Sequence, residues 1–226
     1  MNKNLYIRVA IQLLLFPIFM GALLFLPAGT LDYWEAWVFV AVFFACTIAI
    51  TIWLMLNDPR LLERRMRAGP AAEKETSQKI IVTIALLSFA GLSILSGLDH
   101  RFGWSDVPTS AVILGNILIA LSYIVFYFVL RENTYAASTI QVEENQRVIS
   151  TGPYALVRHP MYTGALIAMI GIPLALGSWW GLLMFVPSAA GIIWRLLDEE
   201  KFLSRNLAGY MEYKNKVRYR LIPFVW

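Results

Sequence analysis

The chain has 226 residues, of which 58% are hydrophobic and only 15% are charged, and its mean hydropathy is +0.61. Soluble domains have a smaller apolar fraction, so this composition excludes an ordinary soluble protein. Short alternating segments of the kind that build membrane β-barrels do not appear, and we predict an all-α, polytopic membrane protein. The single cysteine, Cys46, can form no internal disulfide and is expected to be a small apolar filler.

Six apolar segments approach or reach the roughly 20 residues that a helix needs to cross a bilayer. In chain order they cover residues 5–26, 33–56, 80–98, 107–130, 161–176 and 180–197. The first segment has two basic residues, Lys3 and Arg8, at its start, as a signal peptide would. Its apolar run is too long for a signal peptide and it lacks a convincing cleavage site, so we predict a retained helix.

Lysines and arginines are distributed asymmetrically among these segments. All of them except Arg101 fall at or before the start of the first segment, between the second and third, between the fourth and fifth, or at or after the end of the sixth. The positive-inside rule then places both termini in the cytoplasm and predicts a multi-pass protein of the cell inner membrane. The net charge of +4 is explained by this topology and by anionic lipid headgroups, so we expect membrane lipid and no nucleic acid as a partner.

The stretch "RHPMYTG" opens the fifth segment. Proline suits the first position of a helix and the residue before it avoids the helical conformation, so a helix is predicted to begin at Pro160 with His159 just outside. The free amides of a helix start attract an anion, and Arg158, Tyr154 and Tyr162 stand beside them. These residues predict a small ligand with an anionic group and an aromatic ring. The alternative is that they simply lie at headgroup depth.

Three further stretches are candidates for the same site. Residues 146–150 ("QRVIS") are either an extended piece that offers backbone groups to a ligand or a plain connector. Arg195 lies in the last apolar turn of the sixth segment, where a charge is costly and indicates function, unless it merely pairs with Asp198 or Glu199. The tail, residues 209–226, alternates basic and aromatic residues and is either an interfacial segment or a lid over a cytoplasmic pocket.

The order "GPYALVRHPMYTG", a short apolar hairpin, "DEEKFL" and "GYMEYKNKVRYRLIP" resembles the isoprenylcysteine carboxyl methyltransferase family, in its bacterial branch, and the related phospholipid methyltransferases. The resemblance implies a single domain over residues 1–226. Four transmembrane helices would lie in 1–130, and a catalytic part in 131–226 would bind S-adenosylmethionine over a C-terminal helical hairpin, on cytoplasmic loops. It implies no metal and a catalytic Arg195 that holds the substrate carboxylate. The implied cofactor-binding residues are Gln141, Gln146, Arg147, Val148, Ile149, Tyr154, His159, Pro160, Met161, Tyr162 and Glu199.

The predicted reaction is transfer of the methyl group to a carboxylate of a lipidic, isoprenylcysteine-like substrate. Such a carboxylate is already ionised, so positioning rather than a general base would suffice. An amine acceptor on a phospholipid is the alternative, and it would require a proton acceptor such as Glu199 or Glu200. Two other readings are an NADPH-dependent membrane reductase, with Arg147, Arg158 and Lys216 around a phosphate, and a non-enzymatic transporter or scaffold. The pattern predicts neither the acceptor itself nor the oligomeric state.

Overall fold

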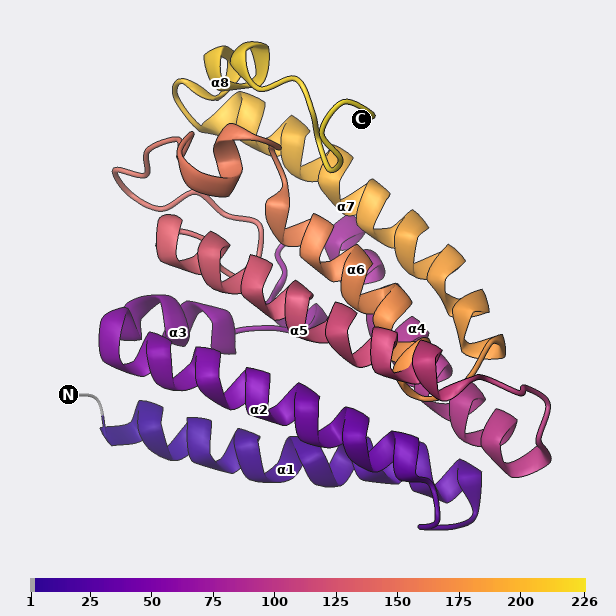
Figure 1. Cartoon of the computed structure of the whole chain (residues 1–226). Helices are drawn as coiled ribbons and strands as arrows, with labels where there is room; N and C mark the ends of the chain where they lie inside the picture. Colours follow the sequence, from indigo (N-terminus) through magenta and orange to yellow (C-terminus); the bar gives the residue numbers. More distant parts are fainter. Residues whose placement is uncertain (1–2) are drawn as a thin grey trace.

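The computed structural model describes residues 3–226, which form helices joined by loops and contain no β-strand, so the predicted all-α class is confirmed (Figure 1). The long helices run alongside one another, and the short helices α3 and α8 lie toward one end of the molecule. In chain order the elements are α1 (Lys3–Ala28), α2 (Trp34–Asn57), α3 (Pro59–Met66), η1 (Pro70–Ala72), α4 (Thr76–Phe102), α5 (Thr109–Glu132), η2 (Gly152–Ala155), α6 (Pro160–Ala175), η3 (Trp180–Met184), α7 (Phe185–Asn206) and α8 (Tyr210–Lys216).

Five helical segments, α1, α2, α4, α5 and the continuous stretch of η3 and α7 (Trp180–Asn206), are long and apolar enough to cross a membrane. The fifth predicted segment forms α6, which has only 16 residues and is shorter than a full span. The sixth predicted segment ended at residue 197, whereas α7 continues to Asn206 because its polar end is rich in good helix formers. The prediction of a polytopic membrane protein is confirmed, with five full spans and one shorter helix.

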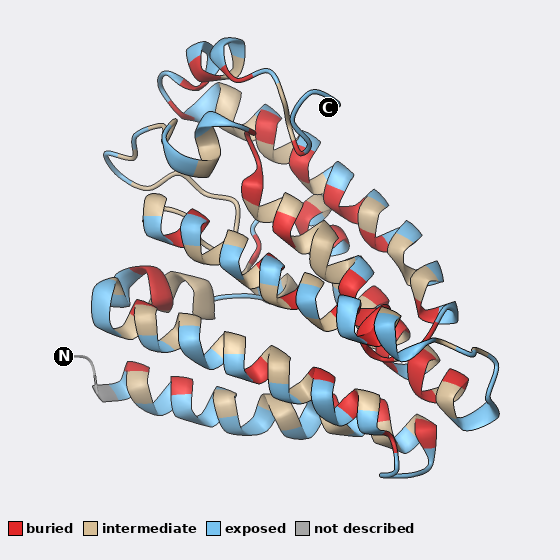
Figure 2. Cartoon of the chain, viewed as in Figure 1, coloured by how far each residue is buried: buried red, intermediate tan, exposed pale blue. Residues whose placement is uncertain are grey.

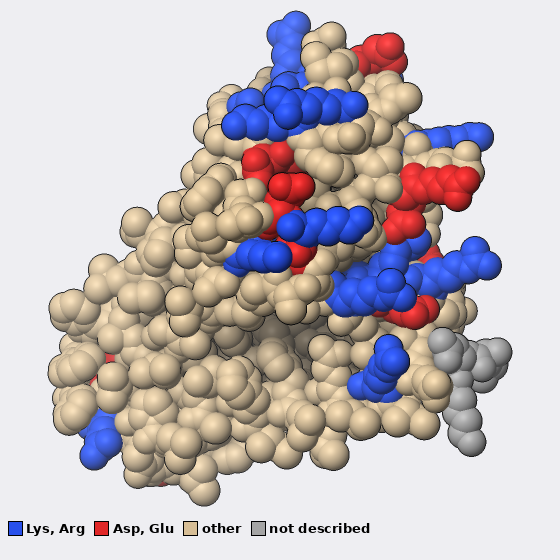
Figure 3. All heavy atoms as spheres, turned by 180° about the vertical axis from the view of Figure 1, so that it is seen from behind, with Lys and Arg blue, Asp and Glu red and all other residues tan. Residues whose placement is uncertain are grey.

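The outer faces of the long helices are apolar and exposed (Figure 2). Leu14 on α1, Leu56 on α2 and Leu87 on α4 are more than half exposed, as expected for side chains that contact lipid rather than water. Charged side chains instead gather at one end of the face shown in Figure 3, next to a hollow in the apolar surface. This end carries α3, α8 and the loops that join α2 to α4 and α5 to α6.

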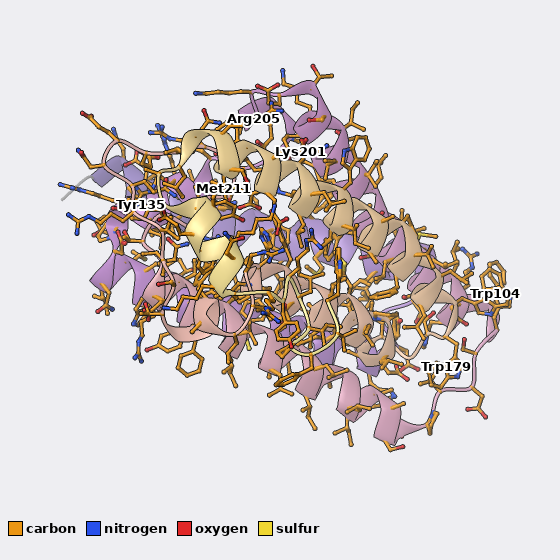
Figure 4. All side chains as sticks on the ribbon, turned by 90° about the horizontal axis from the view of Figure 1, so that it is seen from above. Trp104, Tyr135, Trp179, Lys201, Arg205 and Met211 are labelled. Atoms are coloured by element: carbon orange, nitrogen blue, oxygen red, sulfur yellow. The ribbon has the colours of Figure 1, made fainter. Side chains whose placement is uncertain are left out.

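The opposite end of the molecule is fixed by a buried carboxylate and by tryptophans. Asp99, near the end of α4, accepts hydrogen bonds from the Ser105 backbone N (2.8 Å), the Ser105 hydroxyl (2.7 Å) and the Ser178 hydroxyl (2.5 Å). These bonds tie α4 to the turn between α6 and η3. Figure 4 shows Trp104 and Trp179 at this end, far from Met211 on α8, which agrees with a belt of aromatic side chains at one membrane interface.

The predicted C-terminal hairpin, α6 and α7, forms, but its two helices pack mainly against other partners. Helix α6 lies along α5, and α7 lies along α4. The α5–α6 contact is close because two glycines face each other, Gly115 and Gly171. A Cβ atom on Gly115 would stand 2.2 Å from the backbone N of Ala175, and one on Gly171 would stand 2.9 Å from the carbonyl of Gly115. Small residues allow this approach of two membrane helices.

Replacing Gly115 with alanine should therefore destabilise the protein. The added methyl group meets backbone atoms that cannot move aside, and overpacking of this kind costs about 1–3 kcal/mol. Thermal unfolding in detergent, followed by tryptophan fluorescence, measures the effect. Gly21→Ala on α1 is the matched control, because its nearest neighbour is the Phe25 ring at 3.9 Å. Equal melting temperatures for the two variants would contradict the close α5–α6 contact.

Candidate functional site

The start of α6 is buried beneath the tail of the chain. The helix begins at Pro160 with His159 as its N-terminal cap, as predicted. The backbone N of Arg158 donates to the Tyr219 carbonyl (2.9 Å), and that of His159 donates to the Arg220 carbonyl (3.0 Å). Two amides that would otherwise be exposed before the helix are thereby satisfied, and the tail is fixed in place beside the helix start.

Glu200, on α7, forms ion pairs with several basic side chains beside the start of α6. The side chain is only 4% exposed. Its Oε1 accepts from Arg158 Nε at 2.7 Å and lies 3.3 Å from His159 Nε2. Its Oε2 accepts from Arg220 Nε at 3.2 Å and lies 3.8 Å from Lys214 Nζ. The carboxylate therefore connects α6, α7 and the tail through a dense set of charge-assisted contacts.

Arg158 uses three of its five N–H donors in this cluster. Besides the Glu200 carboxylate, its Nη1 donates to the backbone carbonyls of Val217 (2.9 Å) and Arg218 (3.0 Å). We expected its charge to be available to an anionic ligand beside the helix start. The structure pairs the buried guanidinium with Glu200, and Arg158 also lines the cavity described below.

The neighbouring carboxylate, Glu199, faces a different way. Successive residues on a helix point about 100° apart, so Glu199 turns away from the basic cluster. Its Oε2 accepts from the Tyr162 hydroxyl at 2.5 Å and lies 3.9 Å from His159 Nδ1. Its side chain remains 26% exposed, which leaves it open to a ligand.

Arg195, one turn before Glu199 on α7, holds four segments together. Its Nε donates to the Tyr162 hydroxyl oxygen (3.2 Å) and its Nη1 to Gln78 Oε1 (2.9 Å). Its Nη2 donates to Glu73 Oε1 (2.9 Å) and to the Ser138 carbonyl (2.8 Å). The expected alternative, a pair with Glu199 or Asp198, is therefore wrong. The guanidinium reaches the loop before α4 instead.

These groups surround a cavity of about 370 Å³, a usual size for a small-molecule site. Every residue predicted to bind a cofactor or acceptor contributes to its wall, although these residues lie up to 58 positions apart in the chain. The loop residues Gln141 and Gln146 take part, and their side chains also bond within the loop, to Glu143. The predicted residues that line the cavity are Gln141, Gln146, Arg147, Val148, Ile149, Tyr154, His159, Pro160, Met161, Tyr162, Arg195 and Glu199.

The tail covers one side of this cavity. Tyr210 and Tyr213, on α8, line it and pack with Val148 and Tyr154. The Tyr213 hydroxyl donates to the Tyr154 carbonyl at 2.8 Å, and burial raises the pKa of the Tyr154 hydroxyl to about 12. Of the two expectations for the tail, this packing agrees with a lid over a pocket, and an interfacial position of the tail stays a prediction.

The cavity wall contains a polar group that makes no hydrogen bond within the described part of the protein. Within residues 3–226 the buried hydroxyl of Tyr210 has no hydrogen-bond partner, although it lines the cavity. A buried polar group without a partner is costly, so this hydroxyl fits a site that takes a polar ligand. No group of three or more His, Cys, Asp or Glu side chains in the same residues is arranged to hold a metal ion.

Sequence reasoning missed the part of the wall contributed by the N-terminal half. Arg65 on α3 and three apolar residues of α4, Ile81, Val82 and Ala85, line the cavity. The α4 residues are apolar, like those of a turn that faces lipid, so hydropathy cannot distinguish a turn that lines the cavity from one that faces lipid. Arg65 is one of several arginines in a basic loop and carries no local motif.

Two comparisons with known proteins agree with this arrangement. A model of the phospholipid methyltransferase family matches residues 110–209, which include α5, the cavity loop, α6 and α7. The protein-S-isoprenylcysteine O-methyltransferase B of Arabidopsis thaliana is 28% identical over 153 residues, which are 65% of this chain and 73% of that protein.

Together with the apolar helices and the cavity at their polar end, these matches make the chain similar to membrane methyltransferases. More particularly, the chain is related to the phospholipid and isoprenylcysteine methyltransferases, as its motifs predicted.

Proposed function

We propose that this protein transfers a methyl group from S-adenosylmethionine to a carboxylate of a lipidic substrate at the cytoplasmic face of the inner membrane. The observation that carries the proposal is the cavity, which joins all the residues expected for such a site and lies at the charged end of the apolar helices. The positive-inside rule supports the cytoplasmic assignment of that end.

The cavity fits the cofactor by the chemistry of its groups. Glu199 is an open carboxylate that can accept hydrogen bonds from ribose hydroxyls or offset a positive charge. The free hydroxyl of Tyr210 supplies another polar contact, and Val148, Ile149 and Tyr154 supply apolar and aromatic surface for a base. We propose that these residues, with the others that line the cavity, hold S-adenosylmethionine.

Bound there, the cofactor supplies an electrophilic methyl group on a sulfonium. An ionised carboxylate carries no proton to be removed, so the protein mainly has to orient the acceptor and exclude water. Arg195 lines the cavity and has four of its five N–H donors engaged by protein groups. We propose that it contacts the acceptor with the remaining donor and fixes Tyr162 in place.

Methylation of a phospholipid amine is the second candidate, and the match to the phospholipid methyltransferase family favours it. An amine must lose a proton, and Glu199 is the carboxylate of the cavity that stays open to receive it, since Glu200 is held by basic side chains. Incubating membranes with methyl-labelled cofactor separates the two reactions. A base-labile ester identifies a carboxylate acceptor, and a stable N-methyl lipid identifies an amine.

Binding of S-adenosylhomocysteine, measured by calorimetry on purified protein, tests the cofactor assignment. We expect Glu199→Gln to weaken it roughly tenfold or more, because a hydrogen bond to a charged group contributes about 1.5–3 kcal/mol. Glu144→Gln, an exposed carboxylate of the same loop region that does not line the cavity, is the matched control and should bind normally. Folded wild-type protein that fails to bind at millimolar ligand would refute the proposal.

A further inference from the structure

A second cavity, of about 320 Å³, lies between α1, α2, α3 and α5. Its wall is mostly apolar and includes Phe16, Ile50, Leu54, Phe126 and Leu130. Gln12 and Phe16 also border a groove on the exposed face of α1, beside Ile11, Leu15 and Phe19. The cavity thus reaches a surface that faces hydrocarbon, and it has the character of a site for a lipid chain.

Arg65 connects this cavity with the candidate cofactor cavity. Among the described residues it alone lines both. It lies near the end of α3, where Leu61 and Leu62 pack under α2 and hold the short helix in place. Its guanidinium therefore stands where the polar end of a lipid in the second cavity would meet the first.

The charge of Arg65 is poorly compensated by the protein. Its Nη1 donates to the Ala136 carbonyl at 3.0 Å, and residues 3–226 provide it with no ion pair. Arg158 and Arg195, in contrast, are paired with Glu200 and Glu73. Burial lowers the pKa of the Arg65 guanidinium. A partly buried cation without a counter-charge is suited to bind an anion.

From this geometry we infer that Arg65 binds the carboxylate of a lipid acceptor whose hydrocarbon chain occupies the cavity between α1, α2, α3 and α5. The inference rests on the proposed methyltransferase function, of which it specifies the acceptor. One guanidinium matches the single charge of a carboxylate and can hold both of its oxygens. Arg195 cannot do so in this arrangement, because only one of its N–H donors is left.

Fluorescent fatty-acid binding tests the inference without turnover. Parinaric acid, at mildly alkaline pH, is compared with its methyl ester, which has the same chain and no charge. The wild-type protein should bind the acid roughly tenfold or more tightly than the ester. Arg65→Gln should remove this preference, while Arg67→Gln, an exposed arginine that lines neither cavity, should keep it.

Two further measurements distinguish the effect of the Arg65 charge from the effects of the hydrocarbon-chain site and of fold stability. Thr51→Phe, which fills the second cavity, should weaken the acid and the ester alike and leave S-adenosylhomocysteine binding unchanged. Arg65→Gln should lower the melting temperature only slightly, because it removes one hydrogen bond to the Ala136 carbonyl and no ion pair. A wild-type protein that binds acid and ester equally, or Arg65→Gln protein that still prefers the acid, would overturn the inference.

Competition and cofactor binding complete the test. Oleate should displace parinaric acid better than oleyl phosphate does, and the reverse order would exclude a carboxylate as the recognised group. Wild-type protein that binds S-adenosylhomocysteine yet shows no preference for the acid would refute this inference alone. Protein that prefers the acid yet binds no S-adenosylhomocysteine would refute the proposed function instead.

Discussion

Glu200→Ala should cause the largest loss of stability of any single substitution near the site. The variant leaves the Arg158 guanidinium buried without its counter-charge, and breaking a buried ion pair in this way costs about 3–5 kcal/mol. It also releases Arg220 and Lys214, so the tail loses its ion pairs to α7 and keeps only its apolar contacts there. Thermal unfolding in detergent should show a large drop in melting temperature, accompanied by weaker binding of S-adenosylhomocysteine.

Two comparisons identify the cause of that loss. Glu212→Ala, at an exposed carboxylate of α8, should leave the melting temperature nearly unchanged. Combining Glu200→Leu with Arg158→Met removes both charges and should recover much of the stability lost by Glu200→Ala alone. If the double variant unfolds as readily as the single one, the unpaired Arg158 charge is not the reason, and the packing of the Glu200 side chain is.

Hydropathy predicted the helices of this fold because the bilayer restricts spanning segments to long apolar helices. The start of α6 was also predictable, since Pro160 sets its own backbone conformation and that of His159. Helix pairing was not predictable from the same pattern. The close approach of α6 to α5 depends on Gly115 and Gly171, which are 56 positions apart and look like ordinary small residues of membrane helices.

The sequence motifs predicted which side chains line the cavity, but they did not predict the hydrogen-bond and ion-pair partners of those side chains. Glu199 and Glu200 are indistinguishable in the sequence, and only the orientation of α7 decides that one faces the cavity and the other the basic cluster. Glu73 lies in a polar loop and Arg65 on the short helix α3, and no sequence pattern places either of them near Arg195 or near α6. Long-range pairing of loop residues requires the three-dimensional structure.

Arg195→Ala should abolish methyl transfer. This single variant does not distinguish loss of contact with the acceptor from loss of support for the cavity wall. The substitution leaves the Glu73 carboxylate, which is 2% exposed, without its cation, and this costs about 3–5 kcal/mol. It also frees Gln78 and the Ser138 carbonyl, so the wall of the cavity loosens. A loss of activity in this variant is therefore expected whether Arg195 contacts the acceptor or only supports the cavity.

Combining Arg195→Met with Glu73→Gln distinguishes these two roles, because neither charge then remains unpaired. If Arg195 contacts the acceptor, the double variant should melt near the wild-type temperature and bind S-adenosylhomocysteine normally. Its kcat for labelling of membrane lipids should still fall by about 10²–10³-fold, the usual effect of removing one donor to the reacting group. Lys201→Ala, at an exposed residue of α7, is the matched control. Recovery of transfer in the double variant would mean that Arg195 acts only by supporting the cavity.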